Sequence, residues 1–387
     1  MARNGFKIFD SDTHVGPFVD ILEKYLDAGT KEKLKGWEDY KKAHHRTGHV
    51  TYLKGQRKYR RQLGQAGETP PEKDEAYMAG FTGAHKGREP NPRVDDDPAA
   101  RIEDMDLEGV DVNLTLPSGW FGTWILDDDV SLETAMHQAY NRWMEDYCTP
   151  YPDRLGGVIL VSSRNVAGGV KEIEKWGKSS WAWGVLVYAP MDVPLDHPDL
   201  EPIWKAAADF DLCIALHTFT VMPPYAPGGR DNWNNLFLQR SASHPWCGMR
   251  NMASLIGSGV MDRYPLIRIG TLEAGHSWLP FWMARTDEHY RTIRAALPPE
   301  LKMKPSDYVL SGRYFQSIEI PEGEKLTNSV IDLLGEDILM YASDYPHGES
   351  WFPKSVETVM AWDMTDTRKR KLFWDNAMKL YTRCSHA

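Results

Sequence analysis

Short apolar runs alternate with amphipathic segments along most of the chain. The runs predicted as strands cover residues 6–9, 110–116, 155–161, 184–188, 213–217, 266–272, 314–318 and 338–343. Strands that alternate with helices in this way predict a parallel sheet, and eight such units close most naturally into a (β/α)8 TIM barrel. An open, doubly wound sheet is the alternative. No GxGxxG turn follows any run, so its dinucleotide-binding version has no support.

The amphipathic segments between these runs predict the helices. They cover residues 99–108, 132–147, 170–175, 200–209, 236–258, 277–294, 325–334 and 356–381. Gly109 is expected to end the first helix, and Ser277 is expected to cap the start of the sixth. The pair His244-Pro245 is expected to break the fifth.

Residues 30–98 do not follow this rhythm. They are rich in Lys, Arg, His, Gly and Pro and show little periodicity. Long segments of this kind in a compact domain often cover a functional opening. We therefore expect one barrel domain over residues 1–387, with residues 30–98 inserted after the first strand. The insertion is either a lid over the barrel mouth or a surface excursion without a catalytic part.

Composition restricts the functional classes. The formal net charge is -10, whereas binding to nucleic acid or to an anionic membrane needs a basic face. No apolar run is long enough to span a bilayer, and the first residues lack the apolar region of a signal peptide. The four cysteines are widely spaced and form no CxxC pair, which indicates a reducing compartment. A cytoplasmic location is therefore expected.

Polar side chains collect at the carboxyl ends of the predicted strands, where a barrel keeps its active site. Asp12 and His14 follow the first run, His217 ends the fifth, and Asp344 follows the eighth. Alternate residues of a strand share one side, so Asp12 and His14 could hold the same ion. One such residue alone is usually a cap or a hydrogen-bonded core residue. Several on different strands are hard to explain as caps.

Two carboxylates and two imidazoles suit a divalent transition metal. Zinc is the expected ion, manganese and iron are alternatives, and a second ion is open. No other cofactor is expected.

Motifs that run nearly from end to end carry a family resemblance. They are IFDSDTHV at 8–15, RIEDMDLEGVD at 101–111, AYNRW at 139–143, DRLGGV at 153–158, LEAGHSWLP at 272–280, SDYPH at 343–347 and WDNA at 374–377. In this order they resemble the amidohydrolase superfamily. The similarity is to the amidohydrolase-related (amidohydrolase 2) group, which includes aminocarboxymuconate-semialdehyde decarboxylase and the γ-resorcylate-type decarboxylases. Residues 30–98 fall outside the resemblance.

The resemblance implies roles for these residues. Asp12 and His14 correspond to the metal pair of the first strand, with aspartate where many relatives have histidine. His217 corresponds to the ligand of the fifth strand. Asp344 corresponds to the aspartate of the eighth strand, which is both a metal ligand and a proton-transfer residue. His347 either supports Asp344 or is a loop residue.

The sixth strand departs from the pattern of the decarboxylating relatives, which carry a histidine there as acid or base. This chain has Thr271, Glu273 and His276 near that position. His276 is the candidate for an acid/base role or for a second ligand. Glu273 either binds a second ion or pairs with Arg268 or Arg285. The fourth predicted strand, 184–188, has no terminal lysine, so a carbamylated-lysine bridge is not expected.

The same residues could serve several reactions, and sequence alone does not choose among them. We expect a metal-dependent enzyme that hydrolyses or non-oxidatively decarboxylates a small organic acid, with an aromatic acid as one option. Asp344 would be its proton-transfer residue, and His276 would assist it. One alternative is a non-haem iron or iron/manganese oxygenase. Another is a subunit of a heteromeric enzyme. A homo- or hetero-oligomer is expected from the family resemblance.

Several other side chains could contact a substrate. Aromatic residues after the strand ends either line a pocket or, as we favour, pack helices onto the barrel; they are Trp120, Phe121, Trp124 and Trp351. Arg230 and Arg240 could meet a substrate carboxylate, although surface ion pairs are the usual fate of such residues.

Overall fold

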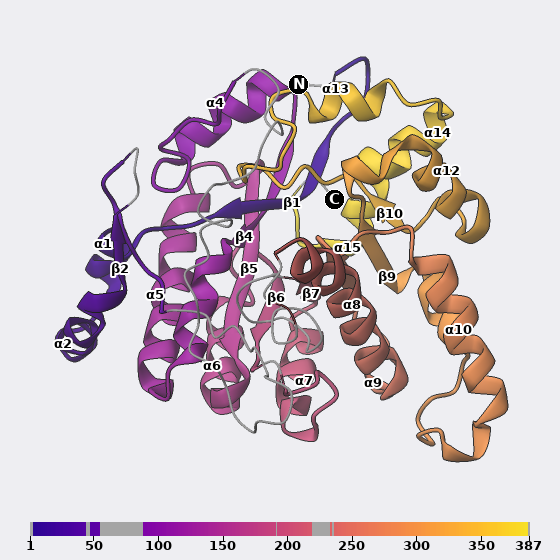
Figure 1. Ribbon diagram of the computed structural model, residues 1–387, viewed down its shortest axis with the longest axis horizontal. Coiled ribbons are helices and arrows are strands. Elements are labelled where there is room, and N and C mark those ends of the chain that lie inside the picture. Colours follow the sequence, from indigo (N-terminus) through magenta and orange to yellow (C-terminus); the bar gives the residue numbers. More distant parts are fainter. Residues whose placement is uncertain are drawn as a thin grey trace.

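The computed structural model describes residues 3–43, 47–54, 88–190, 192–218, 233 and 236–385. Eight parallel strands form one sheet in the order β1-β4-β5-β6-β7-β8-β9-β10, and helices surround it (Figure 1). The strands are β1 (Phe9–Val15), β4 (Val112–Pro117), β5 (Leu155–Ser162), β6 (Ala182–Tyr188), β7 (Cys213–His217), β8 (Ile269–Leu272), β9 (Tyr314–Ser317) and β10 (Leu339–Met340). The predicted (β/α)8 barrel is confirmed.

Hydrogen bonds between β1 and the segment that follows β10 close the sheet on itself. The Ser11 amide donates to the Tyr341 carbonyl at 3.0 Å, and the His14 amide donates to the Tyr345 carbonyl at 2.6 Å. The Asp344 amide donates back to the Asp12 carbonyl at 3.1 Å. First and last strands therefore meet edge to edge, which brings Asp12, His14 and Asp344 together.

The outer layer consists of helices that mostly follow the strands they cover. The main ones are α4 (Pro98–Glu108), α5 (Val130–Cys148), α6 (Val166–Trp176), α7 (Glu201–Asp209), α8 (Leu236–Gly257), α10 (Leu279–Thr292) and α12 (Gly323–Leu334). Gly109 ends α4 in the left-handed conformation, at a φ of 87°, as expected. The C-terminal third of the chain also contains shorter helices: α9 (Val260–Arg263), α11 (Pro305–Tyr308), α13 (Ser355–Met360), α14 (Asp366–Arg370) and α15 (Asn376–Leu380).

Three predictions about helices were wrong. Helix α8 continues through Pro245 instead of breaking there. Ser277 does not cap α10, which begins at Leu279 after Trp278; its amide donates to the Glu322 carboxylate instead. The single helix predicted for 356–381 is divided into α13, α14, a π-helical turn and α15. For Ser277, the contact with Glu322, 45 residues along the chain, replaces the cap that the local pattern predicts.

The strand boundaries also shift in a way that matters for the site. Strand β1 starts at Phe9 and runs to Val15, so Asp12 and His14 lie inside the strand rather than after it. Strand β10 contains only Leu339 and Met340. The rest of the predicted strand leaves the regular ladder before Asp344.

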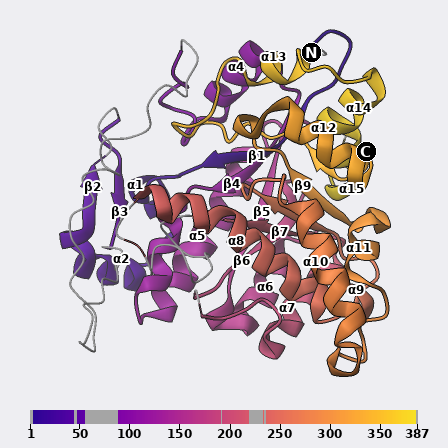
Figure 2. The same ribbon diagram turned by 45° about the vertical axis from the view of Figure 1, so that its right-hand side comes forward.

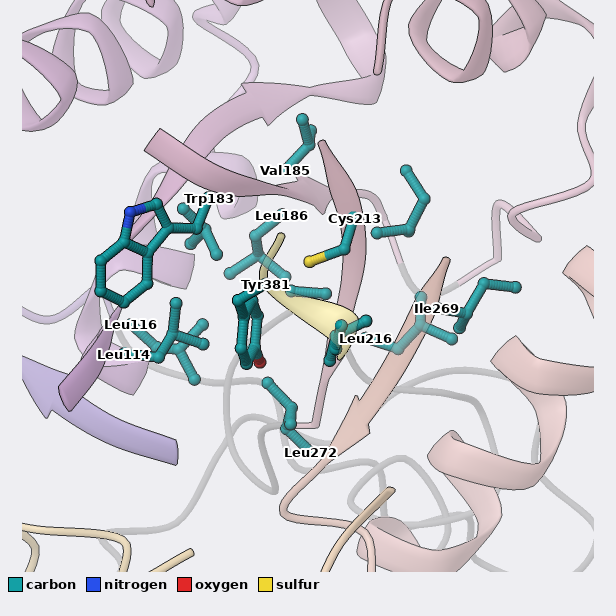
Figure 3. Packing of buried hydrophobic residues seen from close by; sticks show 14 of the residues in the cluster. Leu114, Leu116, Trp183, Val185, Leu186, Cys213, Leu216, Ile269, Leu272 and Tyr381 are labelled. Atoms are coloured by element: carbon teal, nitrogen blue, oxygen red, sulfur yellow. The ribbon is translucent and has the colours of Figure 1, made fainter. Parts of the chain in front are cut away.

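An aromatic cluster fills the amino end of the barrel, opposite the site. Tyr381, just after α15, stacks on Phe9 with ring centroids 5.5 Å apart and 11° between the planes. The Trp183 ring lies against the Phe9 ring, with centroids 5.8 Å apart. Figure 3 shows Tyr381 and Trp183 among apolar side chains of neighbouring strands, including Leu114, Leu186 and Leu216. Tyr381, after the last helix, thus packs into the barrel at the amino ends of the strands.

The described part of the insertion lies to one side of the barrel. Its elements are α2 (Ala28–Leu34), β2 (Lys41–Ala43) and β3 (Val50–Tyr52), and the two strands pair antiparallel. Figures 1 and 2 show them with α1 (Val19–Leu22) beside α5. Residues 55–87 of the predicted insertion lie outside the described residues. The lid therefore stays a prediction.

Two general expectations can be compared with the described residues. None of their helices is long and apolar enough to cross a membrane. All four cysteines are buried, and none of them is in a disulfide.

We expect Gly156→Ala, in β5, to destabilise the barrel. A methyl group at Gly156 would lie 2.1 Å from the Trp183 ring, which is itself packed on Phe9. Overpacking of this kind costs about 1–3 kcal/mol. Urea denaturation of both proteins at one fixed metal content would measure the loss.

Gly257→Ala, at the end of α8, is the matched control because nothing lies within 4 Å of its added methyl group. Equal stability of the two variants would contradict the close packing of Trp183.

Candidate metal centre

Five acidic and histidine side chains meet at the carboxyl end of the barrel. Asp12 and His14 come from β1, His217 ends β7, Glu273 follows β8, and Asp344 follows β10. Each is less than a tenth exposed. Asp12, His14 and His217 offer ligand atoms within 4.8 Å of one another. A second group with the same property shares one residue with the first; it consists of His14, Glu273, Asp344 and His347.

The ring nitrogens and carboxylate oxygens point at a common centre. His14 Nε2 lies 3.4 Å from Asp12 Oδ1 and 3.3 Å from Asp344 Oδ1. His217 Nε2 lies 3.5 Å from Asp12 Oδ1 and 2.9 Å from Glu273 Oε2. These separations place donor atoms from four different strand ends around one small volume.

Hydrogen bonds fix the direction of His14. Its Nδ1 lies 3.1 Å from the Pro117 carbonyl, so Nδ1–H donates there and Nε2 faces the centre. Arg101, which is fully buried, donates to the His14 carbonyl. Histidines that ligate metals in proteins are oriented by bonds of this kind at the other ring nitrogen.

Two of the cluster residues have strained backbones. In the described chain the non-glycine residues with positive φ are Asn4, Asp211, Glu273 and Asp344. Glu273 has a φ of 46° and Asp344 a φ of 59°. Such conformations cost free energy and persist where surrounding structure holds them, often at functional sites. Here they turn two carboxylates toward the barrel axis.

The charge of the cluster fits a cation. Asp12 Oδ1 and Asp344 Oδ2 are buried and accept no hydrogen bond from the described residues. Burial and the Asp344 carboxylate raise the pKa of Glu273 well above its ordinary value. Burial opposes protonation of His14, but the Asp12 and Asp344 carboxylates beside its Nε2 outweigh it and raise the pKa of His14 to about 9. Excess negative charge of this kind is what a bound divalent ion neutralises.

Two further histidines border the centre. His347 donates from Nδ1 to Asp344 Oδ1 at 2.7 Å, and its ring stacks on His14 with centroids 4.0 Å apart. His347 therefore contacts Asp344, as one of its two predicted roles required. His244, from α8, places Nε2 3.4 Å from Glu273 Oε1. Glu273 thus lies between His217 and His244.

The structure does not bring His276 into the cluster. Its Nε2–H donates to Thr327 Oγ1 at 2.9 Å, because the Thr327 hydroxyl gives its own hydrogen to the Gly323 carbonyl. Its Nδ1 accepts a hydrogen bond from the Glu319 amide at 3.2 Å. The same nitrogen lies 3.0 Å from a Glu322 carboxylate oxygen. Both ring nitrogens are thus turned away from the cluster.

The arginine alternatives for Glu273 were wrong. Arg268 pairs with Asp211 at 2.9 Å, and Arg285 pairs with Glu288 at 3.2 Å. Both arginines thus pair with other carboxylates, while the left-handed backbone of Glu273 turns its side chain inward.

The remaining candidates pack or form ion pairs, as favoured. Arg240 pairs with Glu349 at 2.5 Å. Trp120, Phe121 and Trp124 lie against one another. Arg230 lies outside the described residues.

Two residues near the centre were missed in the sequence. Glu319 follows β9, the seventh strand, and burial with nearby Glu273, Asp344 and Asp12 raises its pKa well above the usual range. The rule that found Asp344, a polar residue just after a strand, would have found Glu319 as well. His244 lies inside a helix, so nothing in the local pattern marks it.

A comparison with protein-family models identifies the family of the chain. The Amidohydrolase family model matches residues 12–383. The chain belongs to the amidohydrolase family. The resemblance drawn from the motifs is confirmed, and the chain is an enzyme. A comparison with curated proteins finds no match.

Solved structures share the barrel. An amidohydrolase from Mycobacterium avium subsp. paratuberculosis has 18% identity and a TM-score of 0.71, covering 97% of this chain and 98% of that one. The 5-carboxyvanillate decarboxylase from Novosphingobium aromaticivorans is complexed with manganese and 4-hydroxy-3-methoxy-5-nitrobenzoic acid. It has 19% identity and a TM-score of 0.67, and the match covers 98% of this chain and 97% of that one. A dihydroxybenzoic acid decarboxylase from a Polaromonas species, with bound manganese and 2-nitroresorcinol, has 16% identity and a TM-score of 0.62, and the match covers 97% of each chain.

These comparisons change two expectations for this amidohydrolase. The two decarboxylase structures contain manganese, so the preference for zinc is not supported. Neither the family match nor the solved structures support the oxygenase alternative.

We expect Asp12→Asn and His217→Ala each to lower the metal content of the purified amidohydrolase. Each removes a donor atom that faces the centre, and loss of a ligand is expected to weaken binding more than the about 10- to 100-fold typical of supporting residues. Elemental analysis after dialysis would measure the change.

His289→Gln, on α10, is the control for handling and should keep the wild-type content. An Asp12→Asn or His217→Ala protein that stays fully loaded would remove that residue from the centre.

Proposed function

We propose that this amidohydrolase releases CO2, without oxidation, from a small aromatic acid, and that a divalent metal ion is required. The observation that carries the proposal is the meeting of Asp12, His14, His217 and Asp344 at the carboxyl end of the barrel. Active sites of TIM barrels lie at this end. The decarboxylases with the same fold, and the manganese bound in them, support the reaction class.

Asp12, His14, His217 and Asp344 would hold the ion, with Glu273 as a fifth donor or as a ligand of a second ion. When bound, the ion would supply a Lewis acid that polarises a substrate carboxylate or carbonyl. Carboxylate-rich sets with imidazoles suit manganese, and we propose it in place of zinc. His347, bonded to Asp344 Oδ1, would keep that carboxylate oriented.

Asp344 would be the residue that moves a proton. Burial would raise its pKa, but the His347 and His14 imidazoles hold the pKa of Asp344 well below its usual range. Its Oδ2 accepts no hydrogen bond from the described residues. Asp344 would take the proton of a hydroxyl group next to the substrate carboxylate. It would return that proton to the ring carbon as the bond to CO2 breaks and leaves its electron pair on that carbon.

Hydrolysis is the second candidate, and Glu273 is the observation that favours it. The decarboxylating relatives were expected to carry a histidine at the end of the sixth strand, whereas Glu273 reaches the centre here at 2.9 Å from His217. A third carboxylate would suit two ions and the activation of water. In that reaction Asp344 would take the proton from water.

The proposal includes a cytoplasmic location, an oligomeric state and a lid over the barrel mouth. Four buried cysteines that form no disulfide support a cytoplasmic location. The amidohydrolase family supports an oligomer, and the position of residues 30–98 in the sequence supports a lid.

We expect the manganese-loaded protein to release CO2 from hydroxylated benzoic acids, with 5-carboxyvanillate in the panel. Asp344→Asn should lower the rate about 10²- to 10⁴-fold, because it removes the proton carrier. A coupled CO2 assay and chromatography of the product would measure both.

His289→Gln is the control variant and should match the wild type. If no benzoic acid loses CO2 and esters or amides of such acids are cleaved instead, the hydrolytic candidate replaces the first. A manganese-loaded protein that does neither would contradict the proposed function.

A further inference from the structure

The loop between β8 and α10, residues 273–278, is held in an unfavourable conformation by side chains from outside it. Glu273 and Gly275 have φ values of 46° and 69°. The Glu273 amide donates to Ser317 Oγ at 3.1 Å, and its carbonyl accepts from Thr218 Oγ1 at 2.6 Å. Residues from both neighbouring strands thus fix the backbone of Glu273.

The second half of the loop is bound to the turn that follows β9. The Glu322 carboxylate accepts from the His276 amide at 3.1 Å and from the Ser277 amide at 2.9 Å. Gly275 has a left-handed backbone that favours glycine, and a methyl group there would lie 2.5 Å from Glu322 Oε1 and would displace that carboxylate from the loop. The His276 ring continues the same contact through Thr327 and the Glu319 amide.

This arrangement leaves His276 no ring nitrogen for a substrate or an ion. The loop has few ways to change without moving Glu273, because Ser317, Thr218 and Glu322 bind consecutive parts of its backbone.

We propose that His276 and Glu322 are positioning residues, which clamp the β8–α10 loop so that the Glu273 carboxylate stays between His217 and His244. The proposal rests on the proposed function, since it gives Glu273 a role at the ion. His276 then acts through Glu273 rather than as an acid or base.

The strained φ of Glu273 explains why a clamp is needed. A glutamate in the left-handed region relaxes unless neighbouring groups hold it. Relaxation would withdraw its carboxylate from His217 Nε2, now 2.9 Å away. Partners that orient metal ligands typically change metal affinity by about 10- to 100-fold when they are lost.

A double-mutant cycle on Mn²⁺ binding tests the proposal without a substrate. The dissociation constant of Mn²⁺ is measured by the electron paramagnetic resonance signal of the free ion, in full-length proteins of equal thermal stability. His276→Gln and Glu322→Gln should each weaken binding about 10- to 100-fold. Added to Glu273→Gln, each should change the constant by no more than about twofold, because its effect passes through Glu273.

Glu324→Gln, the same substitution two residues along the chain, is the matched control for Glu322→Gln and should bind Mn²⁺ as the wild type does. Unchanged affinity in His276→Gln and Glu322→Gln, or equal losses with and without Glu273, would overturn the proposal. Glu322 is partly exposed, so its variant decides the matter if His276→Gln does not fold. A wild-type protein that binds no Mn²⁺ would instead contradict the proposed function.

Discussion

The hydrogen bonds that join β1 to the segment after β10 set the geometry on which the metal centre depends. Asp12 and His14 enter from one side of this seam, and Asp344 enters from the other. The bond from the Asp344 amide to the Asp12 carbonyl, at 3.1 Å, couples the two carboxylates through their backbones. Barrel closure and assembly of the centre are therefore one event, because no open sheet would bring the first and last strands together.

Buried polar residues hold the seam from below and from outside. The Asp10 carboxylate accepts from the Ser343 amide at 3.0 Å and from its hydroxyl at 2.5 Å. Arg101, from α4, donates to the His14 carbonyl and lies 5.1 Å from the centre of the Tyr345 ring. Buried charges are costly unless fully bonded. The bonds that Asp10 and Arg101 make here offset that cost and help to hold the two strands together.

The sequence predicts the barrel well because its information is repeated. Each strand and helix has its own periodic pattern, and eight such units permit few topologies. Asp12, His14, His217 and Asp344 were found for a related reason: a polar residue that ends an apolar run is visible locally. His244 and the orientation of His276 were not predictable in this way. The first reaches the centre only through the packing of α8, and the second depends on a bond to Thr327, 51 residues away along the chain.

Glu273 shows how far local reasoning reaches. Its place after β8 is clear from the pattern, but its direction depends on a left-handed backbone that Ser317 and Thr218 impose. Strain at Glu273 and Asp344, together with repulsion among three buried carboxylates, makes the folded chain less stable than its core alone would allow. A cation that binds only the folded chain returns that stability in proportion to its concentration over its dissociation constant. If Glu273 and Asp344 hold the ion as proposed, metal affinity and fold stability are coupled, because the same two strained residues contribute to both.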